Sequence, residues 1–488
     1  MDLNNATYQS LPAVVQRPIY DRSALSTGIV HVGVGHFHRA HHALYLDDLF
    51  QQGKAQEWAV SGLGVISAHE ETRDALVPQD CLYTLTEKTA DGRWDSRVVG
   101  SITEYHHSPD DPALSVKRLA DARTRIVSLT ITEGGYDVDD ATGEFLGNSA
   151  LVRGDLETDG APSSVFGLVL EAMRSRRDEG VGGITIMSCD NVQGNGHVAE
   201  SAFLGFARLK DPEVAKWMEG NVTFPNSMVD RVTPRTVDAD RDYLQDKFGL
   251  ADRWPVTSEP FRQWVLEDKF VAGRPEYEDA GVEVVSDVVP YELMKLRLAN
   301  GTHQALCYFG TLLGHEYVHE AIADPDIHAM LLNYVDLEAV PTLTGIPGMD
   351  FGAYGRTVIE RFGNPQIRDS LARICEDTSD RIPKFLLPGT FHQLKSGGSV
   401  EVAATVVASW ARYAEGTDDD GRALDVRDPL REDLMGRASR QRDEPLAFLE
   451  NRAVFQDLAD LPAFTVPYLC ALETFRTGGS RAVLKQLV

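Results

Sequence analysis

Hydrophobic positions in the first half of the chain come in short, unbroken runs. Aliphatic and β-branched residues fill 28–34, 58–66, 125–132 and 183–187. Such runs, when turn signals bound them, are typical of strands buried in a parallel sheet. Between them the apolar residues are spaced as on amphipathic helices, for example over 164–177 and 197–209. Strands alternating with helices predict an α/β domain.

The pattern changes near residue 290. Helical spacing then dominates, over 292–313, 325–335, 354–362, 366–376, 400–414 and 445–454. A chain of 488 residues is also too long for one ordinary core. We therefore predict an α/β nucleotide-binding domain with a parallel sheet over 1–287 and a mostly α-helical domain over 288–488. The active site is expected in the cleft between them.

A glycine turn follows the first predicted strand. Gly33 and Gly35 permit a tight turn and the close approach of a pyrophosphate to the start of a helix that we predict to run through Phe50. The third glycine of the dinucleotide fingerprint is replaced by His38, so an ordinary turn also fits. Arg39, in the first turn of this helix, could reach a phosphate or pair with a nearby carboxylate.

The second predicted strand ends where dinucleotide-binding folds place an acidic residue for the adenosine ribose. In the segment 64–71 the acidic residues Glu70 and Glu71 lie slightly beyond the expected position, and His69 precedes them. The sequence therefore leaves the choice between NAD and NADP open.

Polar residues follow the later predicted strands. Glu133 directly follows the run 125–132, at the end of the predicted strand, and Asn191 comes shortly after the run 183–187. Ligands of open α/β sheets collect at the carboxyl ends of strands. Asp230, on a segment interpreted as a Pro-flanked loop, could cover the same region. Turn or cap roles explain any one of them, but together they suit a polyhydroxy ligand.

The segment 294–306 carries Lys295, Asn300 and His303. On a regular α-helix, at about 100° per residue, these side chains project within an arc of roughly 140°. Glu292 falls inside the same arc, and the neighbouring residues are mostly apolar. A lysine held in such surroundings with a lowered pKa suits proton abstraction near neutral pH. A structural polar cluster is the alternative interpretation.

Charge and cysteine content narrow the partners. The formal net charge of −27 disfavours nucleic acid and anionic membranes. The five cysteines are isolated and form no CxxC pair, which favours a reduced cytoplasm. Neither a signal peptide nor a membrane-spanning stretch is visible in the sequence. The expected partner is a small molecule, and the expected state is a monomer or weak oligomer.

Clustered histidines raise the question of a metal. His38 and His42 have the i,i+4 spacing of a ligand pair, and His36 and His41 lie beside them. No acidic ligand sits within the same turn, so we expect no metal site here.

Six ordered motifs identify a family resemblance that spans nearly the whole chain. They are GVGHFHRAHHALY (33–45), IVSLTITEGGY (126–136), MSCDN (187–191), FPNSMVDRVTP (224–234), EPFRQWVLEDKFVAGRP (259–275) and MKLRLANGTH (294–303). With them the chain resembles the polyol-specific long-chain dehydrogenase/reductase family, and within it the mannitol 2-dehydrogenases. The resemblance implies a Rossmann-type N-terminal domain, a helical C-terminal domain, NAD (NADP possible) and no metal.

The resemblance also implies residue roles. Lys295 is expected to be the general acid–base, with Glu292 gating the path of the proton to solvent. Asn191 and Asn300 are expected to stabilise the substrate oxygen, and His303 to orient the hydroxyl. Asp230 and Arg373, with Asn191 and His303, are expected to bind the substrate. The expected cofactor-binding residues are Gly33, Gly35, Phe37, Arg39, His69 and Glu133.

Details within the motifs favour D-mannitol and D-fructose as substrates. Uronate reductases of the family carry a lysine where this chain has Gly134. Arg373 and the segment 383–385 resemble the mannitol enzymes, whereas 295–297 resembles the uronate enzymes. D-Fructuronate reductase and D-arabinitol dehydrogenase are therefore the alternatives. A non-catalytic NAD(P) sensor is disfavoured, because it would be expected to have lost the lysine or its amide partners.

Overall fold

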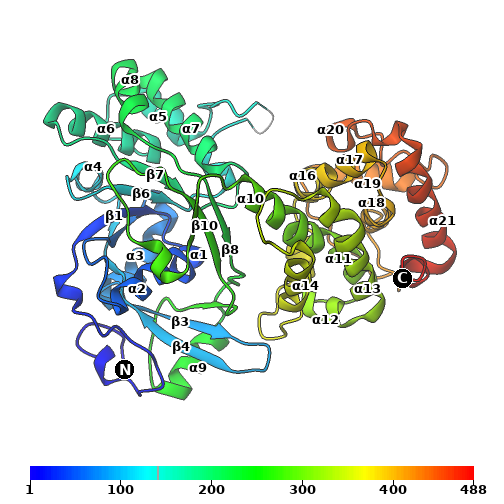
Figure 1. Cartoon of the computed structure of the whole chain (residues 1–488), viewed down its shortest axis with the longest axis horizontal. Coiled ribbons are helices and arrows are strands. Elements are labelled where there is room, and N and C mark those ends of the chain that lie inside the picture. The colour runs from blue at the N-terminus through cyan, green and yellow to red at the C-terminus, as the bar shows by residue number, and fades with distance from the viewer. Residues whose placement is uncertain (140–141) are drawn as a thin grey trace. The chain divides into compact units, whose positions relative to one another are not determined.

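The computed structural model describes residues 1–139 and 142–488. Its internal contacts divide the chain into two compact units, Met1–Val289 and Pro290–Val488. The sequence pattern predicts a division after residue 287. Each unit has its own core and is described by itself (Figure 1).

The N-terminal unit is built on a five-stranded sheet whose strands are all parallel. Its order is β5 (Ile102–His107), β2 (Ala59–Gly64), β1 (Thr27–Val32), β6 (Ile126–Leu129) and β7 (Thr185–Ser188). Val32 pairs with both Leu63 and Leu129, and Leu129 pairs with Ser188, so these strands end at one edge. This confirms the predicted Rossmann-type parallel sheet.

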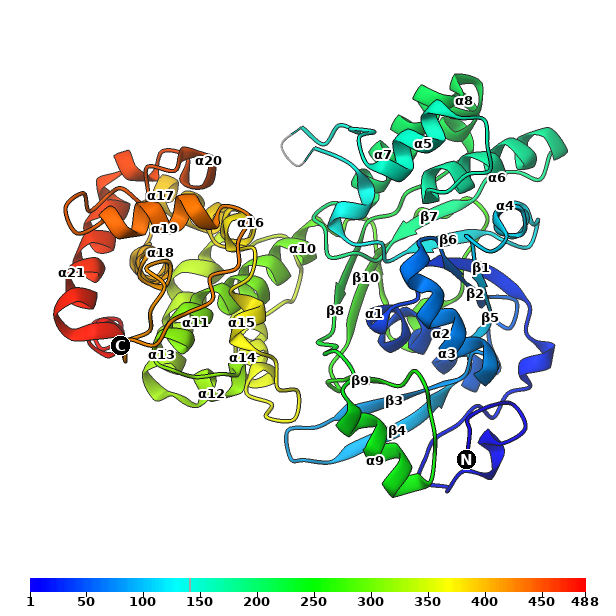
Figure 2. The same ribbon diagram turned by 180° about the vertical axis from the view of Figure 1, so that it is seen from behind.

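Both faces of this sheet are buried, which explains why its strands read as unbroken apolar runs. Ile29 of β1 packs with residues of α2, whereas its neighbour Val30 packs with residues of α6 and α7. Figure 2 shows α2 and α3 on one face of the sheet and α6 to α8 on the other. The helices of this unit are α1 (His36–Ala40), α2 (His42–Gln51), α3 (Glu70–Leu76), α4 (Pro112–Ala120), α5 (Ala150–Glu157), α6 (Val165–Glu179), α7 (Asn195–Lys210), α8 (Pro212–Asn221) and α9 (Asp238–Phe248).

The prediction of one continuous helix from the glycine turn through Phe50 is wrong, because the helix breaks at His41. This residue has φ −126° and ψ −93°, which separates α1 from α2. Its ring stacks on Phe37, and its Nε2 lies 3.0 Å from the carbonyl oxygen of Gln263. Contacts with a distant segment thus override the local helical pattern.

Two small sheets were not apparent in the apolar pattern. One has the order β4 (Trp94–Val99), β3 (Tyr83–Lys88) and β9 (Val256–Ser258), and the other has β11 (Glu283–Val285), β10 (Gln263–Glu267) and β8 (Ser227–Asp230). The interpretation of 228–231 as a loop is therefore wrong. Asp230 ends a strand and pairs with Gln263 of the antiparallel β10.

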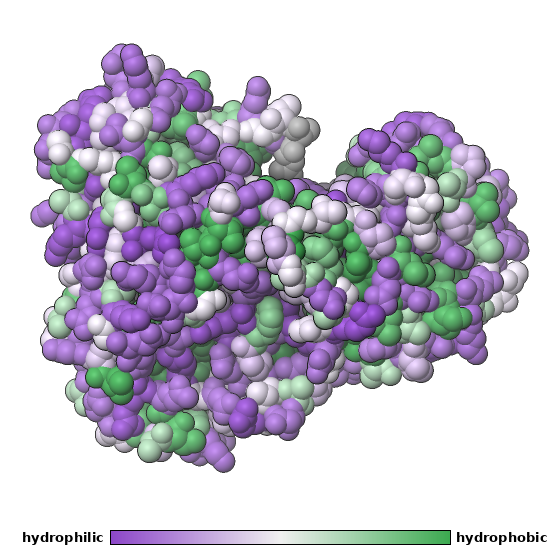
Figure 3. Space-filling view, viewed as in Figure 1, coloured by the Kyte–Doolittle hydropathy of each residue, from purple (hydrophilic) through white to green (hydrophobic). Residues whose placement is uncertain are grey.

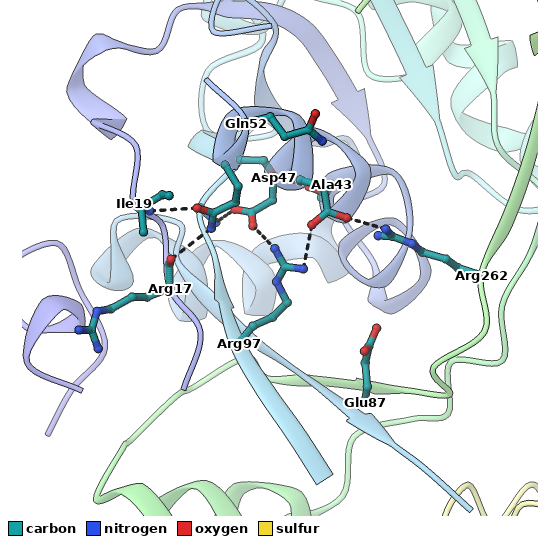
Figure 4. A network of polar contacts seen from close by, with 12 residues as sticks. Arg17, Ile19, Ala43, Asp47, Gln52, Glu87, Arg97 and Arg262 are labelled. Atoms are coloured by element: carbon teal, nitrogen blue, oxygen red, sulfur yellow. Dashed lines mark hydrogen bonds and ion pairs between the residues drawn. The ribbon is translucent and has the colours of Figure 1, made fainter. Parts of the chain in front are cut away.

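A network of ion pairs fixes α2 to β4 and to the residue that precedes β10 (Figure 4). Asp47 is fully buried and accepts hydrogen bonds from Arg97 (2.6 Å) and from the hydroxyl of Tyr20 (2.5 Å). Asp48 accepts from Arg97 (2.9 Å) and Arg262 (2.5 Å). Since buried carboxylates are costly unless paired, this network specifies how α2 sits.

The C-terminal unit is helical, as predicted. Its elements are α10 (Val289–Lys295, whose first residue belongs to the other unit), a π-helical turn (Leu296–Asn300), α11 (Gly301–Leu312), α12 (Val318–Ala323), α13 (Pro325–Asn333), a second π turn (Tyr334–Ala339), α14 (Phe351–Phe362), α15 (Leu371–Ile374), α16 (Thr378–Phe385), α17 (Leu387–Ser396), α18 (Glu401–Tyr413), α19 (Arg431–Arg440), α20 (Arg452–Phe455) and α21 (Pro462–Leu484). Helix α18 is buried on almost every side, which fits its apolar composition, and it packs on α11 and α21.

Two predicted helices are largely wrong. Within 366–376 only α15 is helical, and within 445–454 only α20 is. Phe448 and Leu449 are nevertheless buried in the core of the unit. Apolar spacing reports burial, and buried turns can satisfy it as well as helices do.

Polar side chains cover most of the visible surface of both units, with apolar ones scattered among them (Figure 3). Isolated exposed apolar residues such as Val14, Ile19 and Leu209 are normal in folded proteins. Among the described residues, no helix combines the length and apolar character needed to cross a membrane.

Candidate active site

The glycine turn lies at the carboxyl edge of the parallel sheet, directly after β1. Gly33 has φ +89°, and a Cβ there would lie 2.1 Å from the carbonyl oxygen of Thr130. At Gly35 a Cβ would meet nothing closer than 3.8 Å, so the backbone of this residue faces open space. Thr130 also donates a hydrogen bond of 2.6 Å to the carbonyl of Gly33. A tight turn with an open glycine face fits the close approach of a dinucleotide.

Arg39 does not extend toward solvent from this turn. Its side chain is fully buried and donates to the carbonyl oxygens of Gly35 (3.2 Å) and Trp254. Burial lowers its pKa to about 10. Among the described residues these hydrogen bonds go to backbone carbonyls and not to a carboxylate, and the contact with a phosphate stays a prediction. Arg39 instead supports the turn from within the core.

The histidine cluster consists of His31, His38 and His42, whose nitrogens lie within 4.8 Å of one another. His31 and His38 stack face to face, with ring centroids 3.3 Å apart and planes 13° from parallel. A metal must lie close to the plane of each imidazole that binds it. Because these two ring planes are nearly parallel and lie one above the other, no single position is in both planes. The arrangement is therefore a packed stack, and its geometry does not match that of a three-histidine metal site.

His69 follows β2, where the adenosine ribose is expected. Its Nδ1 accepts a hydrogen bond of 3.1 Å from the backbone N–H of Val65, which fixes the ring against the end of the strand. Burial, and then the nearby His107, lower its pKa. The ring is therefore neutral near pH 7 and offers no charge to attract a 2′-phosphate.

Phe37, another expected cofactor-binding residue, lies on α1 and is half-buried.

Glu133 and Asn191 are both exposed, at the carboxyl ends of the neighbouring strands β6 and β7. The structure brings their two segments together through Asp190. Its carboxylate accepts hydrogen bonds from the backbone N–H groups of Ile131 (3.0 Å) and Thr132 (2.8 Å). Asp190 was missed in the sequence, although it directly precedes Asn191 after a strand, which is the signal that identified its neighbour.

A second polar residue ties this edge to β8. The side-chain N–H₂ of Asn195 donates to the carbonyls of Asp190 (3.0 Å) and Ser227 (2.8 Å), and its oxygen accepts from the N–H of Ser227 (2.9 Å). Asp230, at the other end of β8, is buried. The segments that carry Glu133, Asn191 and Asp230 are thus joined by hydrogen bonds within the N-terminal unit.

In the C-terminal unit, Glu292 and Lys295 lie on α10, and Asn300 and His303 lie on the far side of residue 296. Glu292 is buried, whereas the other three are half-buried. The residues between Lys295 and Gly301 form a π turn, so the arc calculated for a regular α-helix does not apply. Such turns widen the helix locally and are frequent at functional sites.

His303 is held by an aromatic neighbour. Its ring stacks on Phe362 of α14, with centroids 3.6 Å apart and planes 8° from parallel. This stacking restricts the orientation of the imidazole while its nitrogens remain at the ring edge. A fixed imidazole is what orienting a substrate hydroxyl requires.

Arg373 lies on the short helix α15 and is paired with Asp369. Its Nε and Nη2 donate to the two carboxylate oxygens at 2.7 and 2.5 Å. The arginine side chain keeps 54% of its surface exposed. Arg381 donates to the carbonyl of Arg373 at 3.0 Å, and Lys384 pairs with Asp380 at 2.8 Å.

Comparisons with known proteins identify the family of both units. The model of the mannitol dehydrogenase Rossmann domain matches residues 27–279, and that of the mannitol dehydrogenase C-terminal domain matches 287–475. The mannitol 2-dehydrogenase of Pyrenophora tritici-repentis is 42% identical over 100% of this chain and 86% of its own length. That of Cereibacter sphaeroides is 42% identical over 97% of this chain and 99% of its own.

Two solved structures are similar over the whole chain. The ternary complex of Pseudomonas fluorescens mannitol 2-dehydrogenase with NAD and D-mannitol has a TM-score of 0.89 and 41% identity, and covers 100% of this chain and 99% of its own. A D-sorbitol dehydrogenase in substrate-free form has a TM-score of 0.91 and 38% identity, with coverage of 99% and 100%. With both domain models matched in order, the chain belongs to the mannitol dehydrogenase family.

Proposed function

We propose that this protein is an NAD(P)-dependent oxidoreductase that interconverts D-mannitol and D-fructose at C2 without a metal. The observation that carries the proposal is the similarity along the whole chain to the ternary complex with NAD and D-mannitol. The side chains expected to act are all present, and the segments that carry Glu133, Asn191 and Asp230 are joined by hydrogen bonds. D-Fructuronate reduction and D-arabinitol oxidation remain alternatives.

The carboxyl edge of the parallel sheet fits NAD. Gly33 and Gly35 would admit the pyrophosphate, and the segment at His69 would face the adenosine ribose. Phe37 and Glu133 complete the proposed binding residues, and Arg39 supports the turn from inside. When bound, the nicotinamide accepts or donates the hydride of C2.

Lys295 is the proposed base in polyol oxidation. Its neutral amine takes the proton of the C2 hydroxyl, and the resulting ammonium returns it during ketose reduction. The amides of Asn191 and Asn300 donate hydrogen bonds to the oxygen as negative charge develops there. The imidazole of His303, stacked on Phe362, orients the hydroxyl, and Glu292 passes the proton toward solvent.

The rest of the polyol chain is assigned to Asp230 and Arg373. A carboxylate accepts hydrogen bonds from hydroxyl groups and a guanidinium donates them, so the pair suits a neutral polyol. D-Sorbitol is a second candidate substrate, because the similarity to a D-sorbitol dehydrogenase is equally extensive. D-Mannitol and D-sorbitol differ only in configuration at C2, and both yield D-fructose on oxidation there.

A spectrophotometric screen tests the proposal. Oxidation of D-mannitol, D-sorbitol and D-arabinitol is followed as NADH or NADPH formation, and reduction of D-fructose and D-fructuronate as its loss. We expect D-mannitol and D-fructose to give the highest kcat/KM. A higher efficiency with D-fructuronate or D-arabinitol would replace the substrate assignment, and no turnover with any of the five would overturn the proposed function.

A further inference from the structure

Thr132 adopts a backbone conformation that non-glycine residues avoid. It has φ +66° and ψ 166°, in a region that is essentially restricted to glycine. Threonine is branched at Cβ, so steric conflict with its own backbone is severe there. Thr132 immediately precedes Glu133 and follows β6 at the carboxyl edge of the sheet. Strained residues persist only where the surrounding structure holds them, and they cluster at functional sites.

The carboxylate of Asp190 is what holds this segment. Its Oδ1 accepts from the N–H of Thr132 at 2.8 Å, and its Oδ2 accepts from the N–H of Ile131 at 3.0 Å. The hydroxyl of Tyr136 donates to Oδ2 at 2.6 Å. Two adjacent amides are therefore bound to one carboxylate, which fixes the peptide plane between them.

Asp190 is held in an environment that is costly for a carboxylate. It is 7% exposed, and these hydrogen-bond donors are neutral. Burial raises its pKa, and the hydrogen bonds from Tyr136, Ile131 and Thr132 oppose that shift. A buried carboxylate without a cationic partner among these donors does little for stability. Its placement calls for an explanation other than packing.

The position of Asp190 at the edge of the sheet explains why a carboxylate is placed there. It directly precedes Asn191, and its amide-bound partner Thr132 directly precedes Glu133. The clamp thus joins the segments that follow two adjacent parallel strands, where ligands of such sheets bind. Asn195 extends the same network to Ser227 of β8.

We propose that Asp190 is a positioning residue that holds Thr132 in its strained conformation and thereby sets Glu133 beside Asn191. This proposal rests on the proposed function, because Glu133 is assigned there to the cofactor and Asn191 to the reacting oxygen. Without the carboxylate, the segment 131–133 relaxes to an ordinary extended conformation and Glu133 is displaced. The effect falls on kcat, because the glycine turn and the His69 segment still bind the other half of the cofactor.

The test uses Asp190→Asn, which keeps the size of the side chain but places an N–H₂ group against a backbone N–H. A misplacement of about 1 Å costs on the order of 100-fold in rate, so we expect kcat to fall ~10- to 100-fold. The Kd of NADH, from its fluorescence titration, should change less than ~3-fold. Tyr136→Phe is the matched control: it removes a buried hydroxyl from the same carboxylate but leaves both backbone bonds, and its kcat should stay within ~3-fold of the wild type.

A rescue variant separates positioning from stability. Glycine adopts φ +66° without steric cost, so Thr132→Gly should restore part of the lost rate when added to Asp190→Asn. We expect kcat to increase in the order Asp190→Asn, the double variant, Thr132→Gly alone. If Asp190→Asn does not fold, amide exchange of the double variant is compared with that of Thr132→Gly, and equal exchange at residues 131 and 132 would overturn the proposal. A double variant no more active than a folded Asp190→Asn would also overturn it.

Hydrogen exchange gives a readout that does not depend on turnover. In Asp190→Asn the amides of Ile131 and Thr132 should exchange faster, whereas in Tyr136→Phe they should exchange at the wild-type rate. Unchanged exchange in Asp190→Asn would refute the clamp. If the wild type oxidises none of the polyols, the proposed function fails, and amide exchange still tests the clamp separately.

Discussion

The backbone N–H of Gly301 donates its hydrogen bond to the carbonyl of Leu296, five residues earlier instead of four. This π turn begins after Lys295, ends at Asn300 and precedes His303. It changes the rotation between the residues on either side and therefore the directions in which their side chains project. The relation between the proposed base and its proposed partners depends on this one turn.

Replacing Lys295 with alanine should lower kcat by about 10²- to 10⁴-fold, the usual contribution of a positioned acid–base. The Kd of NADH should change little, because the cofactor is assigned to other residues. Lys395→Ala removes an exposed lysine of the same unit and is the control. Turnover near the wild-type value in Lys295→Ala would reject the lysine as base.

Polyol oxidation should rise with pH through a single ionisation. The amine of Lys295 accepts a proton only when it is neutral, and an ordinary lysine has a pKa of about 10.4. Ketose reduction needs the protonated form and should fall over the same interval. Rates measured from about pH 6 to 10 provide the test, and a flat profile would mean that another group or step controls the reaction.

Acid should destabilise the N-terminal unit through its buried histidines. Burial lowers the pKa of His41 and of His42 to about 3, whereas in the unfolded chain it is about 6.5. Between these values the unfolded state binds more protons, so stability falls as the pH drops from about 6.5 toward 3. Burial also lowers the pKa of His38, so His38→Phe, which keeps an aromatic ring in the stack but removes this titrating group, should flatten the dependence in thermal unfolding. A wild-type midpoint that is constant from about pH 7 to 4 would contradict the prediction.

The choice of cofactor should respond to residues 68 and 69. His69 is neutral near pH 7 and neither binds the ribose diol as a carboxylate does nor repels a 2′-phosphate. We expect NAD to work with weak discrimination against NADP. Changing Ala68→Glu and His69→Asp together should raise the ratio of kcat/KM for NAD over NADP. An unchanged ratio would place ribose recognition elsewhere.

Substrate charge provides the last test. D-Fructose should be reduced with higher kcat/KM than D-fructuronate, and with little dependence on ionic strength, because a neutral ligand has no charge to screen. A Cβ on Gly134 would meet nothing within 4 Å, so the first side-chain atom of Gly134→Lys has room. This variant should raise the efficiency with D-fructuronate more than that with D-fructose. A wild type that prefers D-fructuronate would instead support the uronate assignment.

The apolar runs of the sequence were sufficient to predict the parallel sheet, because strands buried on both faces must be apolar at nearly every position. The change to helical spacing near residue 290 likewise predicted the second, helical unit. Glu133, Asn191 and Lys295 could be singled out because chemistry of this kind needs polar groups at strand ends or among apolar neighbours. These features are local, and a single segment of sequence carries each of them.

Only the tertiary structure decided which groups meet. The break at His41 depends on Gln263, the clamp on Thr132 depends on Asp190, and the burial of Arg39 depends on Trp254. Each pair is distant in sequence, and its energy comes from a contact that exists only once the chain is folded. In the π turn after Lys295, the carbonyl of Arg297 likewise accepts a hydrogen bond from the hydroxyl of the distant Tyr334. The sequence by itself determined which side chains were available, and the folded packing determined their geometry.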